Sequence, residues 1–203
     1  GRPLVMRWTA LDADKVNLAL VDLMEADDLD EAIAILRGWY GPSQNAVVVD
    51  DQGRIGWIVT GYLPSRVGFD GSVPVPWAED GVGWDGPLDE ALRPTLVDPE
   101  SGFLYTANNR TVAVHRSIPF GIDWAGGGRA ARIRERLQEA DAPIDEGTLL
   151  SIQLDSRVRV FDFYRDLILE CTKGIRDDSV LAEAREAVSA WNGTADVDQN
   201  AVR

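Results

Sequence analysis

Residues 46–59 read AVVVDDQGRIGWIV, and this stretch decides the fold of the chain. Two runs of β-branched and aromatic residues flank a polar segment that ends in Gly53, a pattern typical of a β-hairpin with a glycine in its turn. The sequence therefore predicts antiparallel strands in the middle of the chain.

Helical periodicity dominates on both sides of this hairpin. Apolar residues recur three and four positions apart over residues 12–24 and 29–40, which predicts two helices before the hairpin. The proline- and glycine-rich residues 61–102 indicate a long loop, and residues 102–107 (GFLYTA) indicate a third strand. Beyond the glycines at 126–128 we expect helices: one capped by Asp145, one over the nearly apolar residues 160–171, and a last one that ends near Trp191.

These elements predict an α+β fold. We expect one partial domain over residues 1–203, helical over 1–41, with strands and long loops over 42–110, and mainly helical over 111–203. Because three strands do not make a self-sufficient sheet, we also expect partner strands outside this sequence.

Composition excludes several classes of function. The chain has 20 Lys and Arg against 34 Asp and Glu, a net charge of −14, which disfavours binding to nucleic acids and to anionic membrane surfaces. No apolar stretch is long enough for a transmembrane helix. A hydrophobic fraction of 45% with 7 Trp indicates a folded protein, and the single Cys excludes an intrachain disulfide.

Most residues with catalytic chemistry have an ordinary interpretation. A Ser-His-Asp triad would need His115, the single histidine, but no Gly-x-Ser-x-Gly motif is present, so we interpret it as a surface or packed residue. Cys171 lies on the apolar face of a predicted helix and is expected to be a buried small hydrophobe. The glycines at 126–128 lack the Lys-Ser/Thr of a phosphate-binding loop and indicate a turn that opens a helix.

Asn108 and Asn109 have two interpretations. Two carboxamides at the end of an apolar run can donate N–H groups to a developing oxyanion. They can equally be turn residues that tolerate left-handed backbone angles. Residue chemistry by itself favours the turn.

Several segments, in order, resemble the penicillin acylase family of N-terminal-nucleophile hydrolases, and together they extend over most of the chain. They are residues 7–11 (RWTAL), 42–45 (PSQN), 53–57 (GRIGW), 61–66 (GYLPSR), 73–77 (VPVPW), 102–109 (GFLYTANN) and 123–133 (DWAGGGRAARI).

In that family a precursor cleaves itself, and the new N-terminal Ser attacks an amide carbonyl with its own α-amino group as the general base. The resemblance therefore implies part of an αββα sandwich and a reaction that needs no histidine. It also implies that Asn108 holds the tetrahedral oxyanion, because the Ala-Asn-Asn segment resembles the site of the family's oxyanion-hole asparagine. Arg129 is similar to the arginine that orients this asparagine and the active-site backbone.

Position 1 is Gly, where the family's catalytic chain begins with Ser. Our hypothesis is that the sequence is an internal fragment of the catalytic beta chain, inactive alone, whose partners are the alpha chain and the rest of the beta chain. The resemblance implies a periplasmic or extracellular parent. Some family members bind calcium, here with the Gly71 carbonyl as one ligand, but residues 110–122 contain no Asp or Glu, so we expect no metal and no cofactor.

The resemblance implies an amidohydrolase that removes the acyl side chain from a small-molecule amide: a penicillin or cephalosporin, an acyl-homoserine lactone or a lipopeptide. The alternative is a non-catalytic binding module that reuses the acylase scaffold and presents Trp57, Trp77 and Trp84 to a ligand. A serine preceded by a processing site upstream of Gly1 would favour the enzyme.

Overall fold

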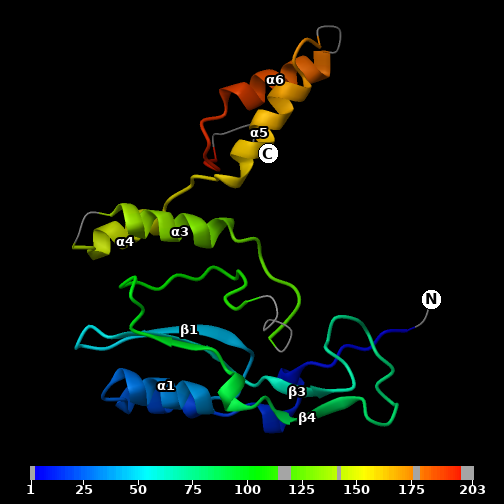
Figure 1. Ribbon diagram of the computed structural model, residues 1–203, viewed down its shortest axis with the longest axis vertical. Helices are drawn as coiled ribbons and strands as arrows, with labels where there is room; N and C mark the ends of the chain where they lie inside the picture. The colour runs from blue at the N-terminus through cyan, green and yellow to red at the C-terminus, as the bar shows by residue number, and fades with distance from the viewer. Residues whose placement is uncertain (1–2, 114–119, 141–142, 176–178, 198–203) are drawn as a thin grey trace. The chain divides into compact units, whose positions relative to one another are not determined.

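The computed structural model describes residues 3–113, 120–140, 143–175 and 179–197. The chain divides into two compact units, Gly1–Ala125 and Gly126–Arg203. The first contains α1 and the β-strands, and the second contains the helices α3 to α6 (Figure 1). The content is α+β, with antiparallel strands, as the sequence predicts.

The predicted hairpin is confirmed. Strands β1 (Gln44–Val49) and β2 (Ile55–Thr60) pair antiparallel, and β5 (Thr95–Val97) pairs with the other edge of β2, so the sheet order is β1-β2-β5. In the turn, Asp50 Oδ1 accepts hydrogen bonds from the backbone N–H groups of Gln52 and Arg54, at 3.0 and 2.9 Å. Gly53 has a φ of 79°, a left-handed angle that glycine adopts without steric cost.

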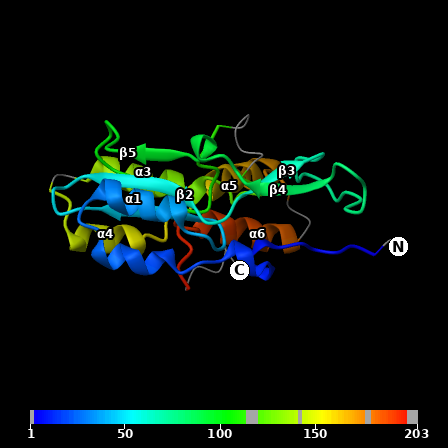
Figure 2. The same cartoon turned by 90° about the horizontal axis from the view of Figure 1, so that it is seen from below.

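Helix α1 (Leu29–Gly38) covers one face of this sheet, as Figures 1 and 2 show from two sides. Asp28 caps its N-terminus by accepting a hydrogen bond from Glu31 N, and the Glu31 side chain accepts one from Asp27 N, both at 2.9 Å. The buried face of α1 packs on Ile58 at the centre of β2, which is fully buried. That face consists of Leu29, Ile33 and Leu36.

The helix predicted over residues 12–24 is wrong. The segment instead forms three 3₁₀ stretches, η1 (Thr9–Leu11), η2 (Ala13–Lys15) and η3 (Ala19–Glu25). Asn17 explains the interruption, because its side chain donates to Gly38 O and accepts from Tyr40 N, both at 3.0 Å. A side chain that binds the end of α1 in this way competes with a continuous helix through its own position.

The strand predicted over residues 102–107 is also wrong, since this segment belongs to neither described sheet. The edge of β2 is occupied by β5, which lies within the predicted loop region. That region also holds η4 (Glu90–Leu92) and a two-stranded sheet of β3 (Pro64–Val67) and β4 (Gly83–Pro87). Residues 61–102 are therefore partly regular.

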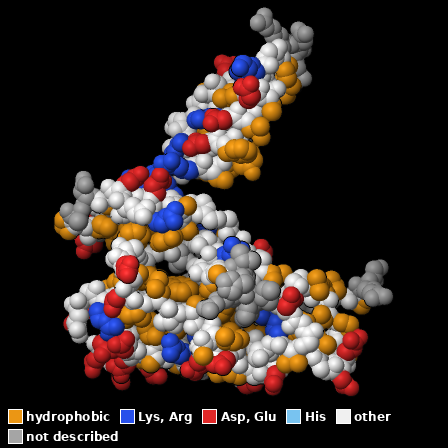
Figure 3. Space-filling view, in the orientation of Figure 1, with side chains coloured by type: hydrophobic (Ala, Val, Ile, Leu, Met, Phe, Trp, Pro, Cys, Tyr) orange, Lys and Arg blue, Asp and Glu red, His pale blue; other side chains and the backbone are white. Residues whose placement is uncertain are grey.

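The unit Gly126–Arg203 confirms the predicted helices, α3 (Gly128–Glu139), α4 (Glu146–Gln153), α5 (Val160–Cys171) and α6 (Ser179–Ala190). Asp145 caps α4 by accepting a hydrogen bond from Thr148 N at 2.7 Å. Trp191 is buried beyond α6 and donates to Thr194 O at 2.6 Å. Cys171 is exposed, which corrects the expectation of a buried residue. The cause is that α5 buries none of its residues. Figure 3 shows hydrophobic side chains at the surface of the molecule.

An ion-pair cluster links α3 to the segment after α4. Arg132 donates to both carboxylate oxygens of Asp155, at 3.0 and 2.6 Å, and to Glu135 at 2.7 Å. Asp155 also accepts from Arg157 N at 3.0 Å. The Arg132 guanidinium is the main cause that holds the pKa of Asp155 below its usual range.

Replacing Ile58 with Ala should lower the free energy of unfolding of the first unit by about 2–5 kcal/mol, because it leaves a cavity under α1. The measurement is urea unfolding followed by tryptophan fluorescence. The control is Val49→Ala on the same sheet, where a side chain that is 68% exposed should cost less than about 0.5 kcal/mol. Equal losses for the two variants would contradict the packing described here.

Asp155 should make the second unit sensitive to acid. A carboxyl whose pKa is depressed in the folded state stabilises it above its unfolded pKa of about 3.9, and this stability is lost as the pH falls through the lower folded value. Asp155→Asn should therefore flatten the dependence of helix unfolding on pH below about 4, measured by circular dichroism. Asp166→Asn, which changes a pair with Arg165 on the helix surface, is the matched control and should leave the dependence unchanged.

Candidate functional site

The candidate site lies on the sheet face opposite α1. Successive residues of a strand point to opposite faces, so Trp57 and Val59 point away from the helix that buries Ile58. They form a second apolar cluster with Leu63 and Leu88, on which Leu104, Val112 and Phe120 pack. The segment that begins at residue 102 therefore crosses this face, and this is the segment that carries Asn108 and Asn109.

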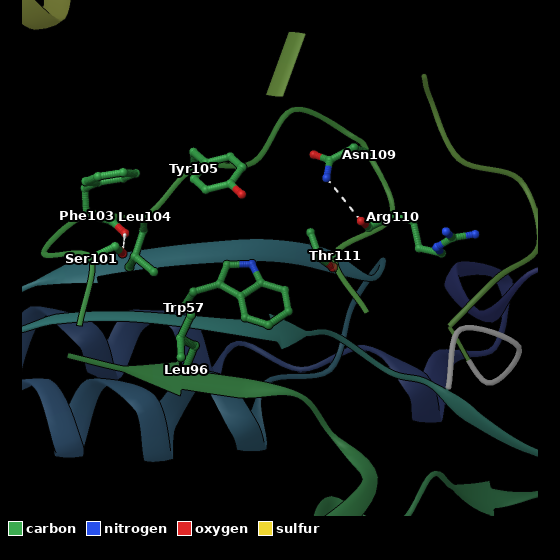
Figure 4. A pocket seen from close by; sticks show the side chains of 9 residues that line it. All are labelled: Trp57, Leu96, Ser101, Phe103, Leu104, Tyr105, Asn109, Arg110 and Thr111. Atoms are coloured by element: carbon green, nitrogen blue, oxygen red, sulfur yellow. Dashed lines mark hydrogen bonds between the residues drawn. The ribbon is translucent and has the colours of Figure 1, made fainter. Parts of the chain in front are cut away.

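A cavity of about 240 Å³ lies between the sheet and this segment (Figure 4). One part is apolar and aromatic, and the other is polar. In Figure 4 the indole of Trp57 lies beneath the cavity, and Phe103 and Tyr105 lie apart from Asn109 and Arg110. Trp57 is held in place by a hydrogen bond from its Nε1 to Asn45 Oδ1, at 3.0 Å. The lining residues are Trp57, Leu96, Ser101, Phe103, Leu104, Tyr105, Asn109, Arg110 and Thr111.

Asn108 occupies a turn beside the cavity. Its φ is 59°, in the left-handed region that asparagine tolerates better than most residues, so its backbone is as the turn interpretation predicts. Its carbonyl oxygen accepts a hydrogen bond from Ala125 N at 3.0 Å, and Asn109 forms a parallel bridge with Ala125. These contacts join the turn to residues that follow it by more than a dozen positions.

Asn109 stabilises the turn with its side chain. Its Oδ1 accepts a hydrogen bond from Ala107 N at 3.0 Å, and its Nδ2 donates to Arg110 O at 3.1 Å. The two carboxamides are therefore in different positions, since Asn109 lines the cavity while the residue Asn108 is exposed at its edge. Both polar atoms of Asn109 bind backbone groups of the same turn.

Arg129 is the second residue of α3 and belongs to the unit Gly126–Arg203, whereas Asn108 belongs to the unit Gly1–Ala125. The residue is exposed at the start of the helix, directly after the glycines at 126–128. The predicted turn into a helix at these glycines is confirmed. His115 lies outside the described residues.

Thr111 is a polar residue of the cavity that sequence reasoning missed. Its Oγ1 is shielded from solvent and has no hydrogen-bond partner within the described part of the chain. A hydroxyl of this kind can donate to or accept from a bound ligand. No local pattern in the sequence distinguishes Thr111 from other threonines, since its position depends on the path of the whole segment across the sheet.

The described residues do not fit a calcium site. Among them, no group of three or more His, Cys, Asp or Glu side chains is placed to hold a metal ion. The backbone at Gly71, whose carbonyl would be a ligand in the calcium-binding members of the family that the sequence resembles, lies against the guanidinium of Arg66. A cation at this position disfavours a second cation.

None of the helices that the structure describes is long and apolar enough to span a membrane.

Comparison with known proteins agrees with the resemblance. The chain is 33% identical to the acyl-homoserine lactone acylase QuiP of Pseudomonas aeruginosa over 155 residues, which are 76% of this chain and 18% of that protein. It is 31% identical to the penicillin acylase 2 proenzyme of Pseudomonas sp. strain SE83 over 167 residues, 81% of this chain and 21% of that protein. The chain thus spans about a fifth of the length of these relatives.

The fold also matches a solved structure. A thermostable penicillin G acylase from Alcaligenes faecalis aligns with 94% of this chain and 34% of its own, with a TM-score of 0.69 and 23% sequence identity. The penicillin amidase family model matches residues 1–203. The chain therefore belongs to the penicillin amidase family.

Proposed function

We propose that this chain is a segment of the catalytic subunit of an acylase, which hydrolyses an acyl amide with an N-terminal Ser that lies outside residues 1–203. Its membership of the penicillin amidase family supports this reaction class. The observation that supports the assignment of a site is the turn at residues 107–109, which holds Asn108 in a left-handed conformation next to a cavity that is part apolar and part polar.

The proposed reaction is nucleophilic acyl transfer. The Ser hydroxyl attacks the amide carbonyl, and its proton passes to the α-amino group of the same residue. The carbonyl oxygen becomes an oxyanion, to which the carboxamide N–H of Asn108 donates a hydrogen bond. The C–N bond then breaks, the amine leaves with the proton, and water hydrolyses the acyl ester to release the acid and regenerate Ser.

The fixed backbone of the turn supports Asn108 as the donor. Asn109 uses Nδ2 and Oδ1 to bind Arg110 O and Ala107 N, and this holds the shape of the turn. The backbone of Asn108 is fixed by the hydrogen bond from Ala125 N. A donor on a fixed backbone needs little reorganisation when negative charge develops, which is the property that an oxyanion hole requires. Only the resemblance to the family supports Arg129 as a positioning residue of the same site.

The cavity suggests where the acyl half binds. Trp57, Phe103 and Tyr105 offer aromatic surface, and about 240 Å³ is less than the roughly 300–1,000 Å³ of pockets that enclose whole ligands. The acyl group would lie there, and the amine half would extend past Asn108. The matched relatives are named as acylases of acyl-homoserine lactones or penicillin, and we propose a small-molecule acyl amide as the substrate class here.

Exposed apolar side chains support the proposed partners, namely the other segments of the same precursor. Val47 and Val49 are exposed on β1, and Phe163 and Leu167 are exposed on α5. Further chain covering these residues would remove apolar surface from water. One matched relative is named a proenzyme, consistent with processing. The proposal includes a periplasmic or extracellular parent, no cofactor, and no activity for residues 1–203 alone.

In the full-length acylase, Asn108→Ala should lower kcat about 10²–10³-fold, because one donor to the oxyanion is lost, and should change KM little. The measurement is release of the chromophore from a phenylacetyl anilide. The control is Gln52→Ala in the β1–β2 turn, which should keep full activity. An Asn108→Ala enzyme with unchanged kcat would contradict the role of Asn108. A parent that cleaves no acyl amide would contradict the enzyme and favour the binding module, which no comparison supports.

Two substitutions of Asn108 separate its structural role in the turn from its chemical role as a donor. Asn108→Gly should raise the free energy of unfolding by up to about 1 kcal/mol, because glycine adopts a φ of 59° without cost, while Asn108→Ala should lower it by about 1 kcal/mol. Both variants lack the carboxamide, so both should lose kcat to the same degree. A Gly variant that is stable and fully active would show that Asn108 serves only the turn.

A further inference from the structure

Arg93 is buried in the first unit and forms no ion pair with the residues that the structure describes. Arg93 lies between η4 and β5, and the residue is only 6% exposed. Its backbone N–H donates to Glu90 O at 3.0 Å. Arginine is almost never fully buried unless it is paired. Neither Arg93 nor its neighbour Arg37 has a carboxylate within 4.0 Å among the residues that the structure describes.

Three buried N–H donors of these two arginines are unsatisfied in the described ranges. They are Nε and Nη1 of Arg93 and Nε of Arg37. Arg37 lies in the last turn of α1, and its Nη2 donates to Thr95 Oγ1 at 3.3 Å, two residues beyond Arg93. Two guanidinium groups thus lie in one region, at the end of α1 and beside the first residue of β5.

The electrostatics of this region are unfavourable. Burial is the main cause that lowers the pKa of Arg93, and the neighbouring Arg37 lowers it further, while Glu90 and Tyr40 act in the opposite direction. A guanidinium does not give up its proton in a protein, so the charge remains. A buried charge that is not paired costs several kcal/mol of folding free energy.

Two carbonyls at the end of α1 are engaged by donors other than the two arginines. Helix carbonyls near a C-terminus attract cations, but Gly38 O accepts a hydrogen bond from Asn17 Nδ2 at 3.0 Å, and Leu36 O accepts one from Thr60 Oγ1. These carbonyls therefore already have donors. Buried polar groups in folded proteins are satisfied by protein, water or an ion, so three unsatisfied donors in one region point to a missing partner.

We propose that Arg93 and Arg37 form an anion-binding site at the C-terminal end of α1, and that its ligand is a carboxylate. The planar guanidinium matches the two oxygens of a carboxylate, with two parallel N–H donors. A single small anion balances the local charge, whereas a polyanion is repelled by a chain of net charge −14. The carboxylate comes from a free small acid or from a side chain of another segment of the acylase. The second source rests on the proposed function.

The first test uses this chain and formate as the probe. At constant ionic strength, formate should raise the melting temperature of wild type with saturation, by about 3–6 °C at ten times its Kd, and should not do so for Arg93→Met. Arg54→Met is the matched control, because Arg54 is half-buried and already paired with Asp30 and Asp98, and its response should equal that of wild type. The same formate response in wild type and Arg93→Met would overturn the site.

A second variant, Arg93→Lys, tests the site if Arg93→Met does not fold. Arg93→Lys keeps the charge but not the two parallel donors, so its response to formate should be weaker and still saturable. Line broadening of ¹³C-formate in NMR reports binding directly and should be present with wild type and lost with Arg93→Met. Absence of broadening with folded wild-type chain would also overturn the proposal.

The same melting experiment on the full-length acylase identifies the source of the carboxylate. If a side chain of another segment fills the site, formate should not stabilise the full-length protein, whereas it should if the natural ligand is a free acid. Neither the melting nor the NMR experiment on this chain depends on amide hydrolysis. Failure of the proposed function therefore leaves a formate response of Arg93 intact, and failure of the anion site leaves the acylase assay intact.

Discussion

The contact between the apolar face of α1 and Ile58 is the interaction on which the first unit depends. Strand β2 lies in the middle of the sheet, so the register that buries Ile58 under α1 also turns Trp57 and Val59 to the opposite face. A shift of one residue would exchange the two faces. The cavity and the turn at Asn108 lie on that opposite face, and the position of the candidate site therefore follows from how α1 packs.

Local patterns predicted those elements whose stability is mainly local. The β1–β2 hairpin has its turn chemistry at Asp50 and Gly53, and α4 has its cap at Asp145, so the sequence contains what each needs. The errors came from contacts between distant positions. Asn17 interrupts a helical pattern by binding the end of α1, and β5 takes the edge of β2 on which a strand at 102–107 would have paired.

The candidate site was less predictable than the fold. Residue chemistry left Asn108 and Asn109 equivalent, and the resemblance to the acylases was needed to choose between them. The structure separates them physically, because Asn109 binds two backbone groups of the turn while Asn108 has the left-handed conformation. Arg93 and Thr111 had no signal in the sequence, since an unsatisfied buried donor or hydroxyl is a property of the packed chain.

We propose that this chain supplies the oxyanion donor of an acylase whose nucleophile lies elsewhere in the same precursor. A serine-reactive sulfonyl fluoride, followed by peptide mapping of the labelled full-length enzyme, tests that claim most directly. We expect one modified residue, an N-terminal Ser outside residues 1–203, together with loss of amide hydrolysis. Inactivation through a modified serine, threonine or Cys171 within residues 1–203 would contradict it.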